Sequence, residues 1–98
     1  MANDLLKGKR GIIFGALDKM SIAWKTAEQA HLQGAIFTLS NTAVALRKGD
    51  IFQLAEKTNS KVIEADVTSV LDLEKVFTES MDVLGGKIDF ILHSVGMS

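Results

Sequence analysis

The chain has 98 residues, of which 47% are hydrophobic and 23% charged, a balance that is typical of a folded globular domain and excludes a disordered chain. The formal net charge of −1 gives no electrostatic basis for binding nucleic acid or an anionic membrane, and the lack of cysteine excludes disulfides and thiolate metal sites. Apolar runs fall well short of the roughly 20 residues of a membrane-spanning helix, and the first residues carry no signal-peptide core, so we expect a cytoplasmic protein with no membrane partner.

The first half of the chain predicts two strands separated by a helix. The continuous apolar run Gly11–Phe14 indicates a strand buried on both faces. Small alanine side chains recur at helical spacing in Ser21–Gln33, and Gly34 follows at the position where helices commonly end. The segment Ala35–Leu39 contains the β-favouring residues of a second strand.

The second half repeats this alternation. We expect a helix over Ala43–Lys57, although Gly49 interrupts its pattern, and a short strand over Val62–Ala65. A third helix starts at Ser69, which resembles a capping box with Asp72. One apolar face of that helix comprises Leu73, Val76, Phe77, Ser80, Met81 and Leu84, and Gly85 and Gly86 end it. The last predicted strand is Ile88–His93.

This β-α-β-α-β-α-β order defines the predicted fold class. Strands that alternate with helices through short connections favour an α/β protein with right-handed crossovers. We therefore predict a Rossmann-like, doubly wound parallel sheet with strand order 3-2-1-4. In such a sheet, ligands bind at the carboxyl ends of the strands, beside the point between strands 1 and 4 where the strand order reverses.

The segment from Gly15 to Ser21 has the layout of a phosphate-binding loop. An apolar strand leads into Gly15, whose missing side chain lets the backbone turn, and a helix then begins at the N-capping Ser21. Unpaired N–H groups and the helix dipole at such an N-terminus attract anions. Gly15 alone matches the usual glycine fingerprint, so a generic strand-to-helix turn remains the alternative interpretation.

Two further loops should converge on the same edge of the sheet. Asp66 and Val67 follow the third strand, where a carboxylate suits an adenine amino group, and Gly96 in the Ser94–Gly96 loop permits close approach of backbone to a ribose or nicotinamide. The alternative role for Asp66 is helix capping or solvation.

The end of the second strand leaves the choice between NADH and NADPH open. It reads Ser40-Asn41-Thr42, without the acidic residue that usually binds the ribose hydroxyls of NAD. Arg47 and Lys48 follow, and they would suit either a 2′-phosphate or a solvated helix face.

Three segments in order, Gly15–Trp24, Ala65–Val67 and Asp89–Gly96, resemble bacterial enoyl-[acyl-carrier-protein] reductase, a divergent short-chain dehydrogenase/reductase of fatty-acid elongation. The distinguishing features are the long Gly-x5-Ser-Ile-Ala loop and His-Ser-Val-Gly, where ordinary short-chain dehydrogenases carry Asn-Asn-Ala-Gly. The resemblance covers essentially the whole chain.

The resemblance implies a role for ten residues. Gly15, Ser21 and Ile22 would bind the pyrophosphate and ribose region of the cofactor, and Thr42 would approach the adenosine ribose, where relatives often carry Gln. Asp66 and Val67 would flank the adenine, and the nicotinamide side would be lined by Ser94, Val95 and Gly96. Ser98 would lie where the backbone begins to meet the acyl substrate.

The activity implied by the resemblance is hydride transfer from NADH, with NADPH not excluded, to C3 of an enoyl thioester carried on acyl-carrier protein, with protonation at C2. The family enzyme is commonly a homotetramer. Its tyrosine and lysine catalytic pair has no counterpart here, because the chain contains no tyrosine. We therefore expect residues 1–98 to form the N-terminal, nucleotide-binding half of one Rossmann-type domain, without catalytic residues and inactive alone. The alternatives are another short-chain dehydrogenase or a nucleotide-binding module without catalysis.

The remaining candidates favour structural roles. His93 is expected to be a strand-end residue held by a hydrogen bond, and His31 a surface residue. Their spacing gives no metal-ligand pattern. Trp24 and Phe77 are expected to pack in the core.

Overall fold

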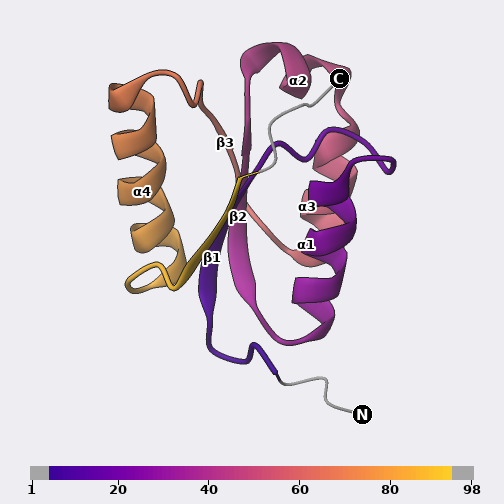
Figure 1. Ribbon diagram of the computed structural model, residues 1–98, viewed down its shortest axis with the longest axis vertical. Coiled ribbons are helices and arrows are strands. Elements are labelled where there is room, and N and C mark those ends of the chain that lie inside the picture. Colours follow the sequence, from indigo (N-terminus) through magenta and orange to yellow (C-terminus); the bar gives the residue numbers. More distant parts are fainter. Residues whose placement is uncertain (1–4, 94–98) are drawn as a thin grey trace.

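The computed structural model describes residues 5–93, and within them four parallel strands form one sheet in the order β3-β2-β1-β4 (Figure 1). The parallel α/β fold and the strand order 3-2-1-4 are thus confirmed. The elements are β1 (Arg10–Phe14), α1 (Ile22–Leu32), β2 (Ile36–Asn41), α2 (Ala43–Lys48), α3 (Asp50–Thr58), β3 (Val62–Glu64), α4 (Val70–Leu84) and β4 (Phe90–His93).

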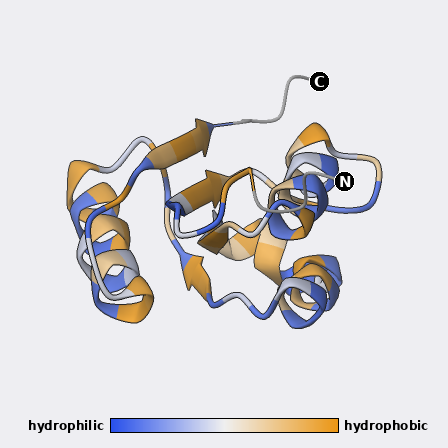
Figure 2. Ribbon diagram, turned by 90° about the horizontal axis from the view of Figure 1, so that it is seen from below, coloured by the Kyte–Doolittle hydropathy of each residue, from blue (hydrophilic) through white to orange (hydrophobic). Residues whose placement is uncertain are grey.

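Helices cover both faces of the sheet, with α1 and α3 on one side and α4 on the other (Figure 1). Alternate residues of the central strand β1 supply the two cores: Ile13 packs with α1 and α3, whereas Ile12 and Phe14 pack with Val76 of α4. Figure 2 shows the hydrophobic strands between the two helical layers. Among residues 5–93, no helix has the length and apolar character needed to span a lipid bilayer.

The helix predicted over Ala43–Lys57 is wrong in one respect, because Gly49 divides it into α2 and α3. Gly49 adopts the left-handed conformation at φ 83°, its N–H donates to the carbonyl of Leu46, and α3 starts at the next residue. A side chain would be strained in this conformation, so glycine serves as both the end of one helix and the start of another. Helix α3 continues to Thr58, and Asn59, whose φ is 54°, caps its C-terminus.

Strand boundaries also differ from the predictions by one or two residues, and three of the differences have a visible cause or consequence. Strand β2 extends past Leu39 to Asn41, because the carbonyl of Asn41 accepts from the N–H of Ala65 at 2.9 Å. Strand β3 ends at Glu64, so Asp66 stands two residues beyond it. Strand β4 begins at Phe90, since the Asp89 carboxylate accepts from the N–H of Arg10 at 2.9 Å before the regular pairing starts.

Helix α4 starts with half of the predicted capping box. The Ser69 hydroxyl accepts from the N–H of Asp72 at 3.3 Å, as expected. The Asp72 carboxylate, however, accepts from the N–H of Asp66 at 2.9 Å and so ties the preceding loop to the helix. Of the predicted apolar face, Ser80 is fully buried and Met81 is exposed.

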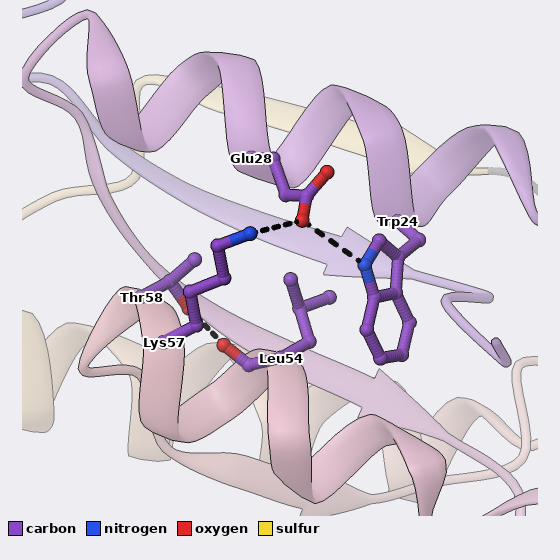
Figure 3. A network of polar contacts seen from close by, with 5 residues as sticks. All are labelled: Trp24, Glu28, Leu54, Lys57 and Thr58. Atoms are coloured by element: carbon purple, nitrogen blue, oxygen red, sulfur yellow. Dashed lines mark hydrogen bonds and ion pairs between the residues drawn. The ribbon is translucent and has the colours of Figure 1, made fainter. Parts of the chain in front are cut away.

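A polar network joins α1 to α3 (Figure 3). The Glu28 carboxylate accepts from the Lys57 ammonium at 2.8 Å and from the indole N–H of Trp24 at 3.3 Å. The hydrogen bond from Lys57 is the main cause that lowers the pKa of Glu28 below its ordinary value, so the carboxylate is ionised at neutral pH. Trp24 itself is buried, as expected of a packing residue.

Candidate functional site

The candidate site lies where β1, β2 and β3 end, at the edge of the sheet predicted to bind ligands. Strand β1 passes into the Gly15–Ser21 loop and then into α1. Gly15 has φ 95°, a conformation that favours glycine, and its N–H donates to the carbonyl of Ser40 at 3.0 Å. The loop therefore leaves the sheet while still paired with β2.

Ser21 organises the loop and caps α1. Its extended backbone (φ −77°, ψ 145°) and its hydroxyl, which accepts from the N–H of Trp24 at 3.2 Å, make it the N-cap. The same hydroxyl accepts from the N–H of Leu17 at 3.3 Å and donates to the carbonyl of Asp18 at 2.9 Å. One donor and two acceptor positions are the full capacity of a hydroxyl, so this group is used entirely within the loop.

The free donors at this helix end are backbone groups. Within residues 5–93, the N–H groups of Ile22 and Ala23 have no acceptor, because the Ser21 hydroxyl bonds to Trp24 and the Ser21 carbonyl to Lys25. Ile22 lies at the first helical position and is 73% exposed. The helix dipole adds partial positive charge at the same point, so an anion would be stabilised there.

The end of β2 contains a residue that the sequence analysis did not single out. The side-chain amide of Asn41 donates to the carbonyl of Ala16 at 2.9 Å and accepts from the N–H of Thr42 at 2.8 Å. Thr42 is exposed and caps α2, since its hydroxyl accepts from the N–H of Ala45 at 3.3 Å. The tendency of Asn to bond nearby backbone at strand ends was the available signal for Asn41.

Asp66 is exposed and belongs to a tight turn. One oxygen of its carboxylate accepts from the N–H of Thr68 at 2.9 Å and from the Thr68 hydroxyl at 2.6 Å. These two hydrogen bonds lower the pKa of Asp66, so the side chain is ionised at neutral pH. Val67 packs against the core between the sheet and α4. Asp66 thus has one engaged oxygen and, within the described chain, a second oxygen without a partner.

The predicted nicotinamide and substrate residues, Ser94, Val95, Gly96 and Ser98, lie outside the described residues. Strand β4 ends at His93, which is exposed and packs edge-on against Phe14 with ring centroids 5.7 Å apart. Within residues 5–93, this aromatic contact is the interaction that the structure shows for the His93 side chain, and the hydrogen bond expected for it stays a prediction. Across the same range there is no cluster of three or more His, Cys, Asp or Glu side chains that would hold a metal ion.

An open groove of about 370 Å³ adjoins the loop on the α3 side. Its lining residues are Asp18, Lys19, Met20, Trp24, Asp50 and Gln53. None of the residues at the ends of β2 and β3 contributes to it. Hydrogen bonds instead join the Gly15–Ser21 loop to Asn41 and Asn41 to Ala65, so the ends of β1, β2 and β3 form the continuous part of the site.

A parallel sheet in the order 3-2-1-4, with a glycine turn and a helix N-terminus after its central strand, defines a Rossmann-like fold. A family model described as enoyl-(acyl carrier protein) reductase matches residues 15–98. The chain belongs to this enoyl-(acyl carrier protein) reductase family.

Individual relatives agree with this assignment. The chain is 58% identical to a protein of known structure, the FabI–NADH complex from Alistipes finegoldii, with a TM-score of 0.92 over 97% of this chain and 34% of that one. It is 34% identical to enoyl-[acyl-carrier-protein] reductase [NADH] 2 of Rhizobium meliloti (strain 1021), over 98% of this chain and 35% of the relative. For the corresponding FabI of Rickettsia bellii (strain RML369-C), the identity is 35% over 100% of this chain and 37% of the relative. The chain thus spans about a third of the length of these relatives.

Proposed function

We propose that this chain forms the nucleotide-binding part of an NADH-dependent enoyl-[acyl-carrier-protein] reductase of fatty-acid elongation. The observation that carries this proposal is the N-terminus of α1, where the N–H groups of Ile22 and Ala23 have no acceptor within residues 5–93 and which follows the central strand through the Gly15–Ser21 loop. Membership of the reductase family and the [NADH] in the names of the relatives support NADH as the nucleotide.

The proposed fit of NADH assigns one part of the cofactor to each loop. The pyrophosphate would lie at the N-terminus of α1 and accept from the N–H groups of Ile22 and Ala23, and Gly15, which has no side chain, would let it approach the backbone. The free oxygen of Asp66 would accept from the adenine amino group, with Val67 beside the ring and Thr42 near the adenosine ribose. Residues 94–96 would adjoin the nicotinamide and Ser98 the acyl chain.

Bound NADH would supply the hydride for C3 of the enoyl thioester carried by acyl-carrier protein. This chain's own residues would bind and orient that cofactor. The sequence contains no tyrosine, so the tyrosine that donates a hydrogen bond to the developing enolate in the family has no counterpart among its 98 residues.

We therefore expect the purified 98-residue chain to bind NADH weakly and to show no enoyl reduction. The assay follows NADH consumption with an enoyl thioester on acyl-carrier protein. Turnover above the protein-free rate would overturn the assignment of this chain as a binding part without catalytic residues.

The phosphate position can be tested by replacing Ile22 with proline. Proline at the first helical position removes one N–H and keeps the helix, because that N–H has no intrahelical acceptor and Ser21 already has the extended backbone that precedes proline. A hydrogen bond to a charged group contributes about 1.5–3 kcal/mol. We therefore expect the Kd for NADH, measured by calorimetry, to rise by about tenfold to a hundredfold.

Val70→Pro is the matched control. Val70 is also the first residue of its helix, follows an extended N-capping serine and is 71% exposed, but it lies on α4, outside the proposed phosphate site. This variant should bind NADH as the wild type does. Ile22→Ala retains the N–H and should therefore lose little affinity for NADH. Equal binding by Ile22→Pro and wild type would refute the phosphate position, and absence of NADH binding by the wild type would refute the proposed function.

A further inference from the structure

We propose that Asn41 is a positioning residue for the nucleotide: its side chain holds the Gly15–Ser21 loop at the end of β2 in the conformation that binds the pyrophosphate. This inference rests on the proposed function. Asn41 itself need not contact the nucleotide, because both polar atoms of its amide are already engaged by backbone groups. Its effect would pass through the loop.

The geometry gives Asn41 contacts with three segments of the site. The amide nitrogen donates to the carbonyl of Ala16 in the loop, and the amide oxygen accepts from the N–H of Thr42. The orientation of the amide follows from its partners, since a carbonyl requires a donor and an N–H requires an acceptor. The backbone carbonyl of Asn41 also accepts from the N–H of Ala65, just before Asp66.

The loop has few other attachments. Among the described residues, two hydrogen bonds join it to β2: the N–H of Gly15 to the carbonyl of Ser40, and the carbonyl of Ala16 to Asn41. The remaining bonds of the loop run between its own residues and the start of α1, centred on Asp18 and Ser21. Loss of the Asn41 bond would leave the loop anchored only at Gly15 and at α1. The loop would then sample more conformations, and the entropy cost of ordering it would weaken nucleotide binding.

Asn41→Asp separates the proposed role from general packing. The new side chain has nearly the same shape, and its oxygen can still accept from the N–H of Thr42. When ionised, however, the new side chain has no donor for the carbonyl of Ala16. One carboxylate oxygen would then face the carbonyl oxygen of Ala16 and repel it. When protonated, the carboxyl O–H can donate to that carbonyl and restore the contact. Asn41→Ala loses the contact at every pH.

The first measurement uses the nucleotide-free 98-residue chain, so it is independent of NADH. We expect hydrogen–deuterium exchange of the Gly15–Ser21 amides at pH 8, corrected for intrinsic rates, to accelerate about fivefold to tenfold in both variants, the effect of losing one neutral hydrogen bond. Near pH 4, where an Asp side chain begins to protonate, Asn41→Asp should recover protection towards the wild-type value, and Asn41→Ala should not. This pH-dependent rescue would not arise from a general loss of packing.

Other ionisable groups lie on the elements and loops next to β2, and each variant is therefore compared with wild type at the same pH. These groups are Asp18 in the loop, Arg47 and Lys48 in α2, Asp50 in α3, Glu64 opposite Asn41 on β3, and Asp66. Thr42→Asp controls for the added charge: it places a carboxylate at the next residue, retains an N-capping side chain and leaves the Asn41–Ala16 bond in place. Its loop should exchange at the wild-type rate.

The second measurement is the Kd for NADH at pH 8, which we expect to rise by about fivefold to tenfold in Asn41→Ala. The inference would be overturned if the loop amides of both Asn41 variants exchanged at the wild-type rate while the far-UV circular dichroism spectrum stayed unchanged. Accelerated exchange without any change in Kd would also overturn it. If wild type does not bind NADH, the proposed function fails, and with it the role of Asn41 towards the nucleotide, even where exchange confirms its contact with the loop.

Discussion

Replacing Gly11 with alanine is expected to destabilise the chain by about 2–3 kcal/mol, the upper part of the range for adding a methyl group to a packed core. Gly11 is buried in β1 and stands opposite Phe90 of β4. The Cζ, Cε1 and Cε2 atoms of the Phe90 ring occupy the space that a Cβ atom at residue 11 would need. The added methyl group would displace the ring or separate the strands, and denaturant unfolding measures the loss.

A second substitution identifies the cause. Phe90→Leu removes the three ring atoms that conflict with a Cβ atom at residue 11 while leaving an apolar side chain. In this background, Gly11→Ala should cost about 1–2 kcal/mol less than in the wild type, a coupling typical of residues in direct contact. If Gly11→Ala costs the same in both backgrounds, its effect comes from the strand backbone and not from Phe90.

Two serines of equal burial should respond oppositely to the same substitution. Ser80 of α4 shares a hydrogen bond of 2.6 Å with Thr38 of β2, and both side chains are fully buried. Ser80→Ala leaves the Thr38 hydroxyl buried without a partner, so we expect a loss of about 2 kcal/mol in the free energy of unfolding.

Ser40 is the matched case, because it is also fully buried and its hydroxyl has no partner among the described residues. Ser40→Ala removes a buried hydroxyl that has no hydrogen-bond partner among the described residues. We therefore expect the free energy of unfolding to stay unchanged or to rise by up to about 1 kcal/mol. Thermal or denaturant unfolding of the two variants in parallel measures the difference. A larger loss from Ser40→Ala than from Ser80→Ala would contradict both assignments.

The strands and their order follow from sequence patterns because buried parallel strands read as short apolar runs, and right-handed crossovers leave few arrangements. The same patterns predict that Gly15, Ser21 and Asp66 follow the carboxyl ends of their strands, as the structure shows. Gly49 was visible as an interruption of the helical pattern, but the break itself was harder to predict, because a single glycine is often tolerated inside a helix and its backbone conformation is not visible in its neighbours.

The contacts that shape the site depend on tertiary structure. Asn41 meets Ala16 across 25 residues of sequence, and Thr38 meets Ser80 across 42. Such pairs require the register of the sheet to be known, which periodicity does not supply. The hydroxyl of Ser21 shows the same limit: its residue type predicted an N-cap, but its bonds to Leu17 and Asp18 depend on the path of the loop.

The burial of Trp24 has an optical consequence. It is the sole tryptophan of a chain that has no tyrosine, so the intrinsic fluorescence comes essentially from one indole. Trp24 is 3% exposed in the first turn of α1, close to the helix end where we place the pyrophosphate, and its indole N–H donates to Glu28. Reduced nicotinamide absorbs where indole emits, so the emission of this chain reports on a single position beside the proposed cofactor site without any added label.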